Sequence, residues 1–212
     1  MKVIGWRCLL HHTTVNSYTE FYNSSIAHSG DFHKGKLRRI LQQGYGHGGG
    51  IVLICGWEVA RMKPRVLVSL CLLGIACRYD GRDNGIALKE LMDRCALIPV
   101  CPEQLGGLPT PRVPAERRGD AVVTLDGGDV TDAFRTGAAR TAQLAAQFGA
   151  QYALLKARSP SCGVHEIYDG HFTGTVIPGA GVTAEALRSL GVRLYDEYHI
   201  DELLKELDGE NA

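Results

Sequence analysis

The sequence lacks any long hydrophobic run and any excess of charge. Its longest apolar stretches, residues 51–55 and 66–73, fall well short of the ~20 residues that a membrane-spanning helix needs, so we expect no membrane partner. Lys plus Arg and Asp plus Glu each number 23, so the chain has no global charge that would attract a polyanion. Binding of a nucleic acid polymer is therefore not expected, whereas a small nucleotide-like ligand remains compatible with the composition.

The sequence also lacks the cysteine pattern of a secreted disulfide scaffold. Seven cysteines are an odd number, and the early apolar stretch is broken by Arg7, His11 and His12, which does not fit a signal peptide. No two cysteines lie two to four residues apart, as the paired ligands of many zinc sites do. We therefore expect reduced thiols and a cytoplasmic protein.

Composition changes abruptly near Met62. Residues 1–61 contain no proline and have seven Lys or Arg against three Asp or Glu, which leaves 16 against 20 in the rest of the chain. The glycine-rich tract 44–50 resembles a linker, because no strand precedes it as a phosphate-binding loop would require. We predict that residues 1–61 are a flexible extension, with a misplaced translation start as one explanation, and that residues 62–212 form the functional domain.

Apolar runs and helical periodicity alternate after Met62. Short strands are predicted at residues 66–70, 97–100, 121–124, 152–156 and 192–195. Helices are predicted from Asn84 as cap, over 132–148 up to Gly149, from Thr183 as cap to Gly191, and over 200–207. The inward faces of the first two helices are expected to carry Leu88, Leu91, Met92 and Cys95, and Phe134, Ala138, Ala145 and Phe148.

This order of elements predicts an α/β fold. Strands that alternate with helices favour a Rossmann-like layer with a mostly parallel sheet flanked by helices. Asp169-Gly170 lies between short apolar residues and indicates a tight turn, so a small hairpin is expected near residues 165–175.

Three of the seven cysteines follow predicted strands. Cys71 ends the first strand, Cys101 ends the second, and Cys162 lies six residues past the strand that ends at Lys156. Ligands of open α/β sheets bind outside the carboxyl ends of the strands, so these thiols are expected to converge at one edge. Cys77, six residues after Cys71, is ambiguous. The remaining cysteines have simpler interpretations: Cys95 on a helix face, and Cys8 and Cys55 in the extension.

Converging thiolates suit a soft metal such as zinc, copper(I) or an iron–sulfur cluster. Three unrelated buried cysteines are an equally weighted interpretation on spacing alone. The loops beside two of the cysteines favour a site, because each is rigid, polar and rich in Gly or Pro. Glu103 lies two positions after Cys101, and Ser159 and Ser161 precede Cys162.

At these residues the sequence resembles the thiouracil desulfurase family, a bacterial domain long of unknown function. The resemblance covers about residues 65–196 and leaves out the extension. It is carried, in order, by Cys71-Leu72-Leu73-Gly74, Cys77-Arg78-Tyr79-Asp80-Gly81, Pro99-Val100-Cys101-Pro102-Glu103, Gly107-Leu108-Pro109-Thr110-Pro111-Arg112, Asp129-Val130-Thr131 and Ser159-Pro160-Ser161-Cys162-Gly163.

The resemblance implies a [4Fe-4S] cluster held by Cys71, Cys101 and Cys162, with one iron left free for the substrate's sulfur. It implies that Glu103 is the catalytic acid/base and that Ser159 is the active serine, with Ser161 as its substitute. The implied reaction is a non-redox desulfuration of a thiolated pyrimidine-like compound, from C=S to C=O with release of hydrosulfide. The implied partners are a small thiolated heterocycle and the cluster-assembly machinery.

Two other classes of function stay open at this point. One is a thiolate-bound zinc protein, hydrolytic or structural, in which Cys77 supplies a fourth ligand. The other is a non-enzymatic α/β module that binds a small molecule or nucleotide.

Overall fold

A computed structural model describes residues 63–211 of the chain. The predicted extension, residues 1–61, lies outside the described residues, and so does the boundary at Met62. In chain order the elements are β1 (Arg65–Ser69), the 3₁₀ helix η1 (Leu70–Leu73), α2 (Lys89–Arg94), β2 (Ala96–Val100), α3 (Pro102–Leu105), β3 (Ala115–Arg118), β4 (Ala121–Thr124), α4 (Thr131–Phe148), β5 (Tyr152–Leu155), β6 (Glu166–Tyr168), β7 (Val176–Pro178), α5 (Val182–Ser189), β8 (Arg193–Asp196) and α6 (Ile200–Asn211). None of the helices in this described part is long and apolar enough to cross a membrane.

Four parallel strands form the main sheet, in the order β2-β1-β5-β8. The central strand β1 contains three consecutive apolar residues, Val66, Leu67 and Val68, which are fully buried, as a strand covered on both faces requires. The predicted α/β fold with a mostly parallel sheet is therefore confirmed.

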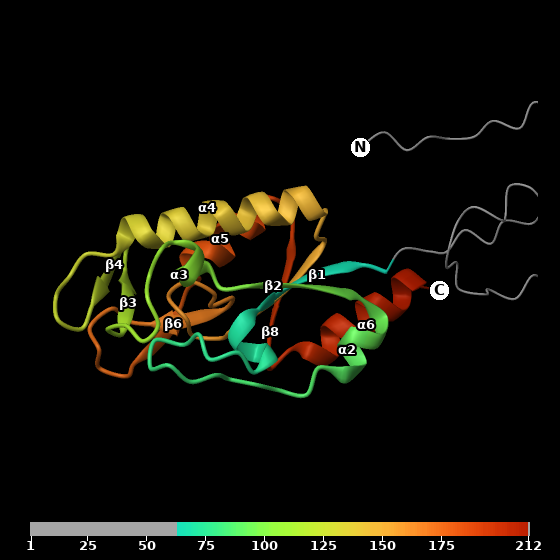
Figure 1. Cartoon of the computed structure of the whole chain (residues 1–212), viewed down its shortest axis with the longest axis horizontal. Coiled ribbons are helices and arrows are strands. Elements are labelled where there is room, and N and C mark those ends of the chain that lie inside the picture. The colour runs from blue at the N-terminus through green and yellow to red at the C-terminus, as the bar shows by residue number, and fades with distance from the viewer. Residues whose placement is uncertain (1–62, 212) are drawn as a thin grey trace, which may run out of the picture. The chain divides into compact units, whose positions relative to one another are not determined.

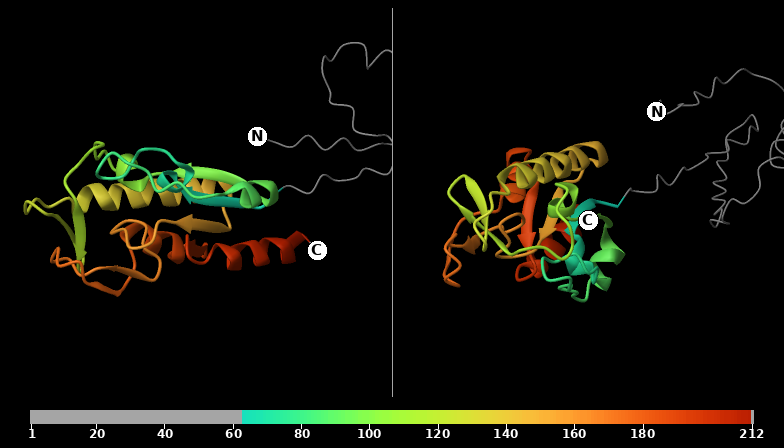
Figure 2. Two further views of the ribbon diagram at one scale, coloured as in Figure 1. Left: turned by 90° about the horizontal axis from the view of Figure 1, so that it is seen from below. Right: turned by 60° about the vertical axis from the view of Figure 1, so that its left-hand side comes forward.

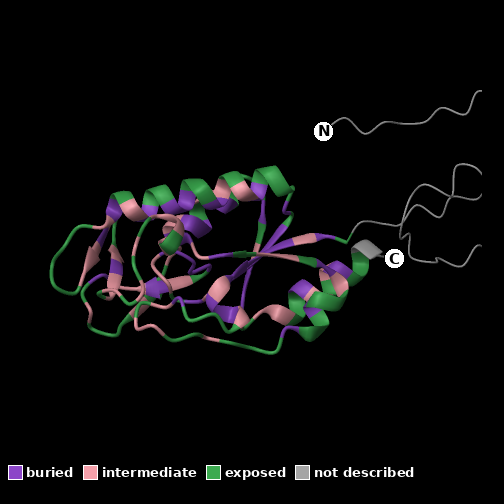
Figure 3. Ribbon diagram, in the orientation of Figure 1, coloured by how far each residue is buried: buried purple, intermediate pink, exposed green. Residues whose placement is uncertain are grey.

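Helices cover both faces of this sheet. One apolar cluster joins alternate residues of β1 to Leu91 of α2 and to Leu203 and Leu207 of α6. The other joins Leu67 of β1 to α4 and to Leu187 of α5. Figure 1 shows α4 and α5 on one side of the sheet and α2 and α6 on the other. The two inner strands, β1 and β5, are almost wholly buried between them (Figure 3).

Two antiparallel hairpins lie beyond the carboxyl ends of the strands. They are β3–β4 and β6–β7, and they project from the same end of the sheet in both views of Figure 2. They contact each other: Arg118 donates to the carbonyl of Gly170, and the backbone N–H of Phe172 donates to Glu116. The hairpin predicted near residues 165–175 is present.

Several local predictions were wrong. The tight Asp169-Gly170 turn is instead the start of a seven-residue connection between β6 and β7, residues 169–175. The strand predicted at 121–124 is present as β4, although it pairs with β3 outside the main sheet. Thr183 lies inside the first turn of α5 and does not cap it, because its hydroxyl is bonded to another side chain.

The helix predicted from Asn84 begins later, at Lys89. Asn84 does not cap it, because its amide oxygen accepts a hydrogen bond from Arg78 at 2.5 Å. Two expected inward side chains point to solvent: Met92 is 56% exposed and Phe148 is 48% exposed. Leu91 is the buried residue of α2, and Phe148 is the last residue of α4, so periodicity alone overestimates the buried face.

Candidate metal and active site at the carboxyl edge of the sheet

The candidate site lies where the connections leave the sheet in opposite directions. The connection after β1 leads to β2 on one side of it, and the connection after β2 leads to β5 on the other side of β1. The boundary between β1 and β5 is therefore a topological switch point. Cys71 lies in η1 directly after β1, Cys101 follows β2, and Cys162 lies in the loop after β5. The structure brings these thiols close enough for their charges to interact. Cys101 and Cys71 both raise the pKa of Cys162, and Cys101 raises the pKa of Cys71.

Burial keeps most of these thiols in the neutral form. It raises the pKa of Cys71 and of Cys162, which are only 8% and 5% exposed. It also raises the pKa of Cys77 to about 12, with the nearby Cys101 and Cys71 thiols as further causes. Cys101 is the more accessible member of the group, because its side chain is half-buried.

Two polar side chains donate hydrogen bonds to the sulfurs. The hydroxyl of Ser69, at the end of β1, donates to Cys162, and the side chain of Asn84 donates to Cys71. Both hydrogen bonds lower the pKa of the thiol that they reach, because they favour the thiolate. Asn84 is held for this role by Arg78, which occupies its amide oxygen and so leaves the NH₂ group free to donate.

Cys77 belongs to the same group of side chains. It shares a hydrogen bond with Cys101, which helps to raise the pKa of Cys77. Its backbone carbonyl accepts a hydrogen bond from Arg112 at 3.1 Å. Geometry therefore places a fourth thiol next to the three that follow the strands.

Glu103 faces this group from the first turn of α3. Its charge acts on Cys162 and raises the pKa of that thiol, although burial is the larger cause. Two nitrogens of Arg112 contact one carboxylate oxygen, Oε2, at 2.7 and 2.6 Å. Among the described residues, no hydrogen bond reaches the other oxygen, Oε1. Glu103 is thus held firmly at one oxygen and has the other available for a ligand.

Glycines allow α3, which carries Glu103, to dock on α4. A Cβ atom added at Gly137 would lie 1.9 Å from the backbone oxygen of Pro102, and one added at Gly106 would lie 2.1 Å from that of Ala133. Such contacts are far inside van der Waals distance, so only glycine allows this approach. The position of Cys101 and Glu103 therefore depends on two glycines, Gly106 at the end of α3 and Gly137 in α4.

The two serines of the Cys162 loop differ in their surroundings. The hydroxyl oxygen of Ser159 accepts hydrogen bonds from the backbone N–H groups of Ser161 and Cys162, both at 3.1 Å, and its O–H has no acceptor among the described residues. Ser161 is 1% exposed, and its hydroxyl is bonded to that of Thr183 at 2.9 Å. The geometry favours Ser159 over Ser161 as the serine that meets a ligand.

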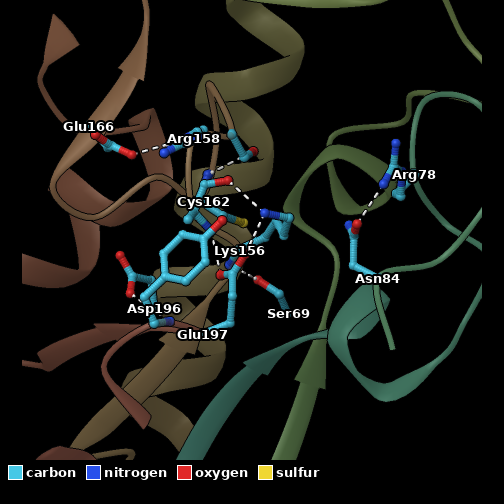
Figure 4. Close-up of polar contacts among 12 residues, drawn as sticks. Ser69, Arg78, Asn84, Lys156, Arg158, Cys162, Glu166, Asp196 and Glu197 are labelled. Carbon is cyan, nitrogen blue, oxygen red and sulfur yellow. Dashed lines mark hydrogen bonds and ion pairs between the residues drawn. The ribbon is translucent and has the colours of Figure 1, made fainter. Parts of the chain in front are cut away.

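The charges around the thiols are paired. Lys156, which acts on Cys71, forms an ion pair with Glu197, and the other oxygen of Glu197 accepts the N–H of Ala157 at 2.8 Å. Figure 4 shows Lys156, Glu197 and Ser69 gathered around Cys162. Arg112 pairs with Glu103 in the same way. Sequence reasoning missed these partners. Lys156 could have been found, because a lysine directly after a buried strand indicates a charged partner near the site.

The remaining nearby guanidinium is neutralised as well, because Arg78 pairs with Asp80 at 3.0 Å. Within residues 63–211, the cations that contact this site therefore leave no positive charge to balance several thiolates. Buried charges need a partner, and a bound metal centre supplies one while deprotonating its thiols. The donor set of soft sulfur atoms fits zinc or an iron–sulfur cluster.

A parallel α/β sheet with a group of thiols at its switch point defines a candidate soft-metal protein of the Rossmann-like type. Comparison with known proteins specifies the family. The sequence pattern of the 2-thiouracil desulfurase family matches residues 66–199, and the chain belongs to that family. The expected resemblance is thereby confirmed.

Two similar proteins support this assignment. The uncharacterized protein YbbK of Bacillus subtilis (strain 168) is 41% identical over 150 residues, which are 66% of this chain and 99% of that protein. The solved structure of the [4Fe-4S]-dependent thiouracil desulfidase TudS is 44% identical, with a TM-score of 0.67. The match covers 69% of this chain and 99% of TudS.

Proposed function

We propose that this protein is an iron–sulfur-dependent desulfurase that converts a thiouracil-type C=S group to C=O. The observation that carries the proposal is the group of thiols from three adjacent parallel strands, in a chain of the desulfurase family that is 44% identical to a [4Fe-4S]-dependent enzyme. In this proposal Cys71, Cys101 and Cys162 hold a [4Fe-4S] cluster. The reaction is C=S plus H₂O to C=O plus H₂S, which involves no net change in oxidation state.

When bound, the cluster supplies an iron with an open coordination position, which is a Lewis acid for the sulfur of the substrate. Glu103 supplies the base. Its ion pair with Arg112 is formed by the ionised carboxylate, and Oε1 is available to take a proton from the attacking water. The same carboxyl group can then return a proton to the departing sulfur.

Ser159 positions the reactants in this proposal. Because its oxygen is already bonded to two backbone N–H groups, the hydroxyl is held in place with its hydrogen free for the heterocycle or the water. Ser161 supports the same loop from its buried position against Thr183. A catalytic function for Ser161 stays a prediction.

Cysteine substitutions with cluster analysis test this proposal. In the anaerobically purified full chain, Cys71→Ala, Cys101→Ala and Cys162→Ala should each lower the iron and sulfide content and abolish conversion of 2-thiouracil. Cys95→Ala is the matched control, because Cys95 is buried like Cys71 and Cys162, at 3% exposure, but its thiol donates to the carbonyl of Leu91.

The measurements also separate the alternatives. A colourless protein with one zinc and no sulfide would favour the thiolate-bound zinc protein. A brown holoprotein that binds thiouracil without converting it, or binding that survives the loss of all three cysteines, would favour a non-enzymatic module. Normal iron in Cys101→Ala and loss of iron in Cys95→Ala would overturn the ligand assignment.

The cellular setting follows from the same chemistry. We infer that the protein works in the cytoplasm and receives its cluster from the cluster-assembly machinery, because the five described cysteines are free thiols. We also propose that residues 62–212 are sufficient for function. The chain shortened to begin at Met62 should retain its iron and its activity.

A further inference from the structure

A second group of metal-binding side chains lies at the carboxyl edge of the same sheet and contains no cysteine. It consists of His165, Asp196 and His199, each of which offers one ligand atom, and the three atoms lie within 4.8 Å of one another. Asp196 is the last residue of β8, His199 precedes α6, and His165 lies in the loop between Cys162 and β6. Three distant segments of sequence therefore meet here.

The carboxylate of Asp196 is the buried centre of this group. Its side chain is only 4% exposed, whereas that of His199 is 40% exposed. Oδ1 is contacted by His199 Nδ1 at 2.5 Å and accepts the backbone N–H of Tyr198 at 3.1 Å. Among the described residues, every hydrogen bond to this carboxylate goes to Oδ1, so Oδ2 is left for a ligand. Figure 4 shows Asp196 beside Glu197, close to the thiol site but on its far side from Asn84.

The two imidazoles lie against each other at the surface. The ring centroids of His165 and His199 are 4.9 Å apart, in an edge-to-face arrangement. A metal ion bound by Nδ1 of His199 and by the Asp196 carboxylate replaces the proton that these two groups share in the hydrogen bond. In the described part of the chain, no hydrogen bond reaches a ring nitrogen of His165.

We propose that His165, Asp196 and His199 form a second metal site that binds a divalent first-row transition ion, with Zn²⁺ as its best occupant. Two imidazoles and one carboxylate suit zinc far better than Mg²⁺ or Ca²⁺, which prefer oxygen ligands alone. Three protein ligands leave one tetrahedral position of zinc to water. The site differs from the thiol site in its ligands, which are nitrogen and oxygen atoms and include no sulfur.

Zinc binding to the anaerobic holoprotein tests this inference. The full chain with its cluster should bind one equivalent of Zn²⁺, measured by metal analysis after gel filtration and by calorimetry. Loss of a residue that only supports a metal ligand weakens metal binding ~10–100-fold. His165→Ala and His199→Ala each remove a ligand and should weaken zinc binding by at least that much. His171→Ala, which removes an exposed histidine from the β6–β7 connection, is the matched control and should change the affinity less than twofold.

X-ray absorption at the zinc edge identifies the ligands independently of affinity. The proposal expects nitrogen and oxygen at about 2.0–2.2 Å and no sulfur at about 2.3 Å. Sulfur in the zinc shell would mean that zinc had entered the thiol site and would overturn the inference. Unchanged affinity in both histidine variants would overturn it as well. Neither result depends on desulfurase activity, so the outcome is separate from that of the proposed function.

Discussion

Replacing Glu103 with glutamine is the sharpest test of the proposed chemistry. Glutamine keeps the length of the side chain and can still accept a hydrogen bond from Arg112, but it cannot take a proton at neutral pH. Arg112 contacts only Oε2, so the change removes the base at Oε1 while one contact to the arginine persists. General acid–base catalysis contributes ~10²–10⁴-fold, so we expect turnover to fall at least about 100-fold, which corresponds to about 2.7 kcal/mol in the barrier.

The assay must separate loss of chemistry from loss of the cluster. Conversion of 2-thiouracil and release of sulfide are measured anaerobically, beside iron content and visible absorption. We expect a normal cluster, a nearly normal KM and a reduced kcat, with Glu103→Asp between the two. Glu90→Gln is the matched control, because Glu90 also pairs with an arginine, Arg94 at 3.5 Å, but is 75% exposed and remote from the thiols.

Two results would refute the assignment. Full activity of the glutamine variant as a holoprotein would remove Glu103 from the proton transfer. Loss of iron in that variant would make Glu103 a ligand or a structural support for the site. Either result would move the search for the base to Ser159 or to solvent.

Two further predictions concern the surroundings of the site. Cys77→Ala should keep iron, sulfide and activity if three cysteines hold the cluster; loss of iron would make Cys77 a ligand and contradict the open position. Gly137→Ala should lower the free energy of unfolding by about 1–3 kcal/mol, because its Cβ would lie 1.9 Å from the oxygen of Pro102. Chemical denaturation measures this change, and Gly209→Ala, where nothing lies within 4 Å, is the control that should not destabilise.

The sheet could be predicted because its signal is local in sequence. The apolar residues 66–68 form a strand that is fully buried, and Gly149 ends α4 with a left-handed φ of 61° as predicted. The positions of Cys71 and Cys101 then follow from a rule of topology, because parallel strands end at one edge. Local pattern and one topological rule therefore suffice to place Cys71 and Cys101 at one edge of the sheet.

The polar partners of the site could not be predicted in this way. Lys156 meets Glu197 across 41 residues, and Arg112 meets the carbonyl of Cys77 across 35. Asn84 is the clearest case: its local sequence favours a helix cap, but its tertiary contacts with Arg78 and Cys71 hold it elsewhere. Propensity describes what a residue does with its neighbours in sequence, and here the neighbours in space decide.

The balance of charge explains why a site of this kind holds a metal centre. Burial raises the pKa of Cys71 and Cys162, and the hydrogen bonds from Ser69 and Asn84 oppose that shift only in part. Lys156 does not neutralise a thiolate, because Glu197 already pairs with it. In the apoprotein these thiols therefore stay protonated, so they do not repel one another. A metal centre that binds here must displace those protons, so its uptake should release protons and become weaker as the pH falls.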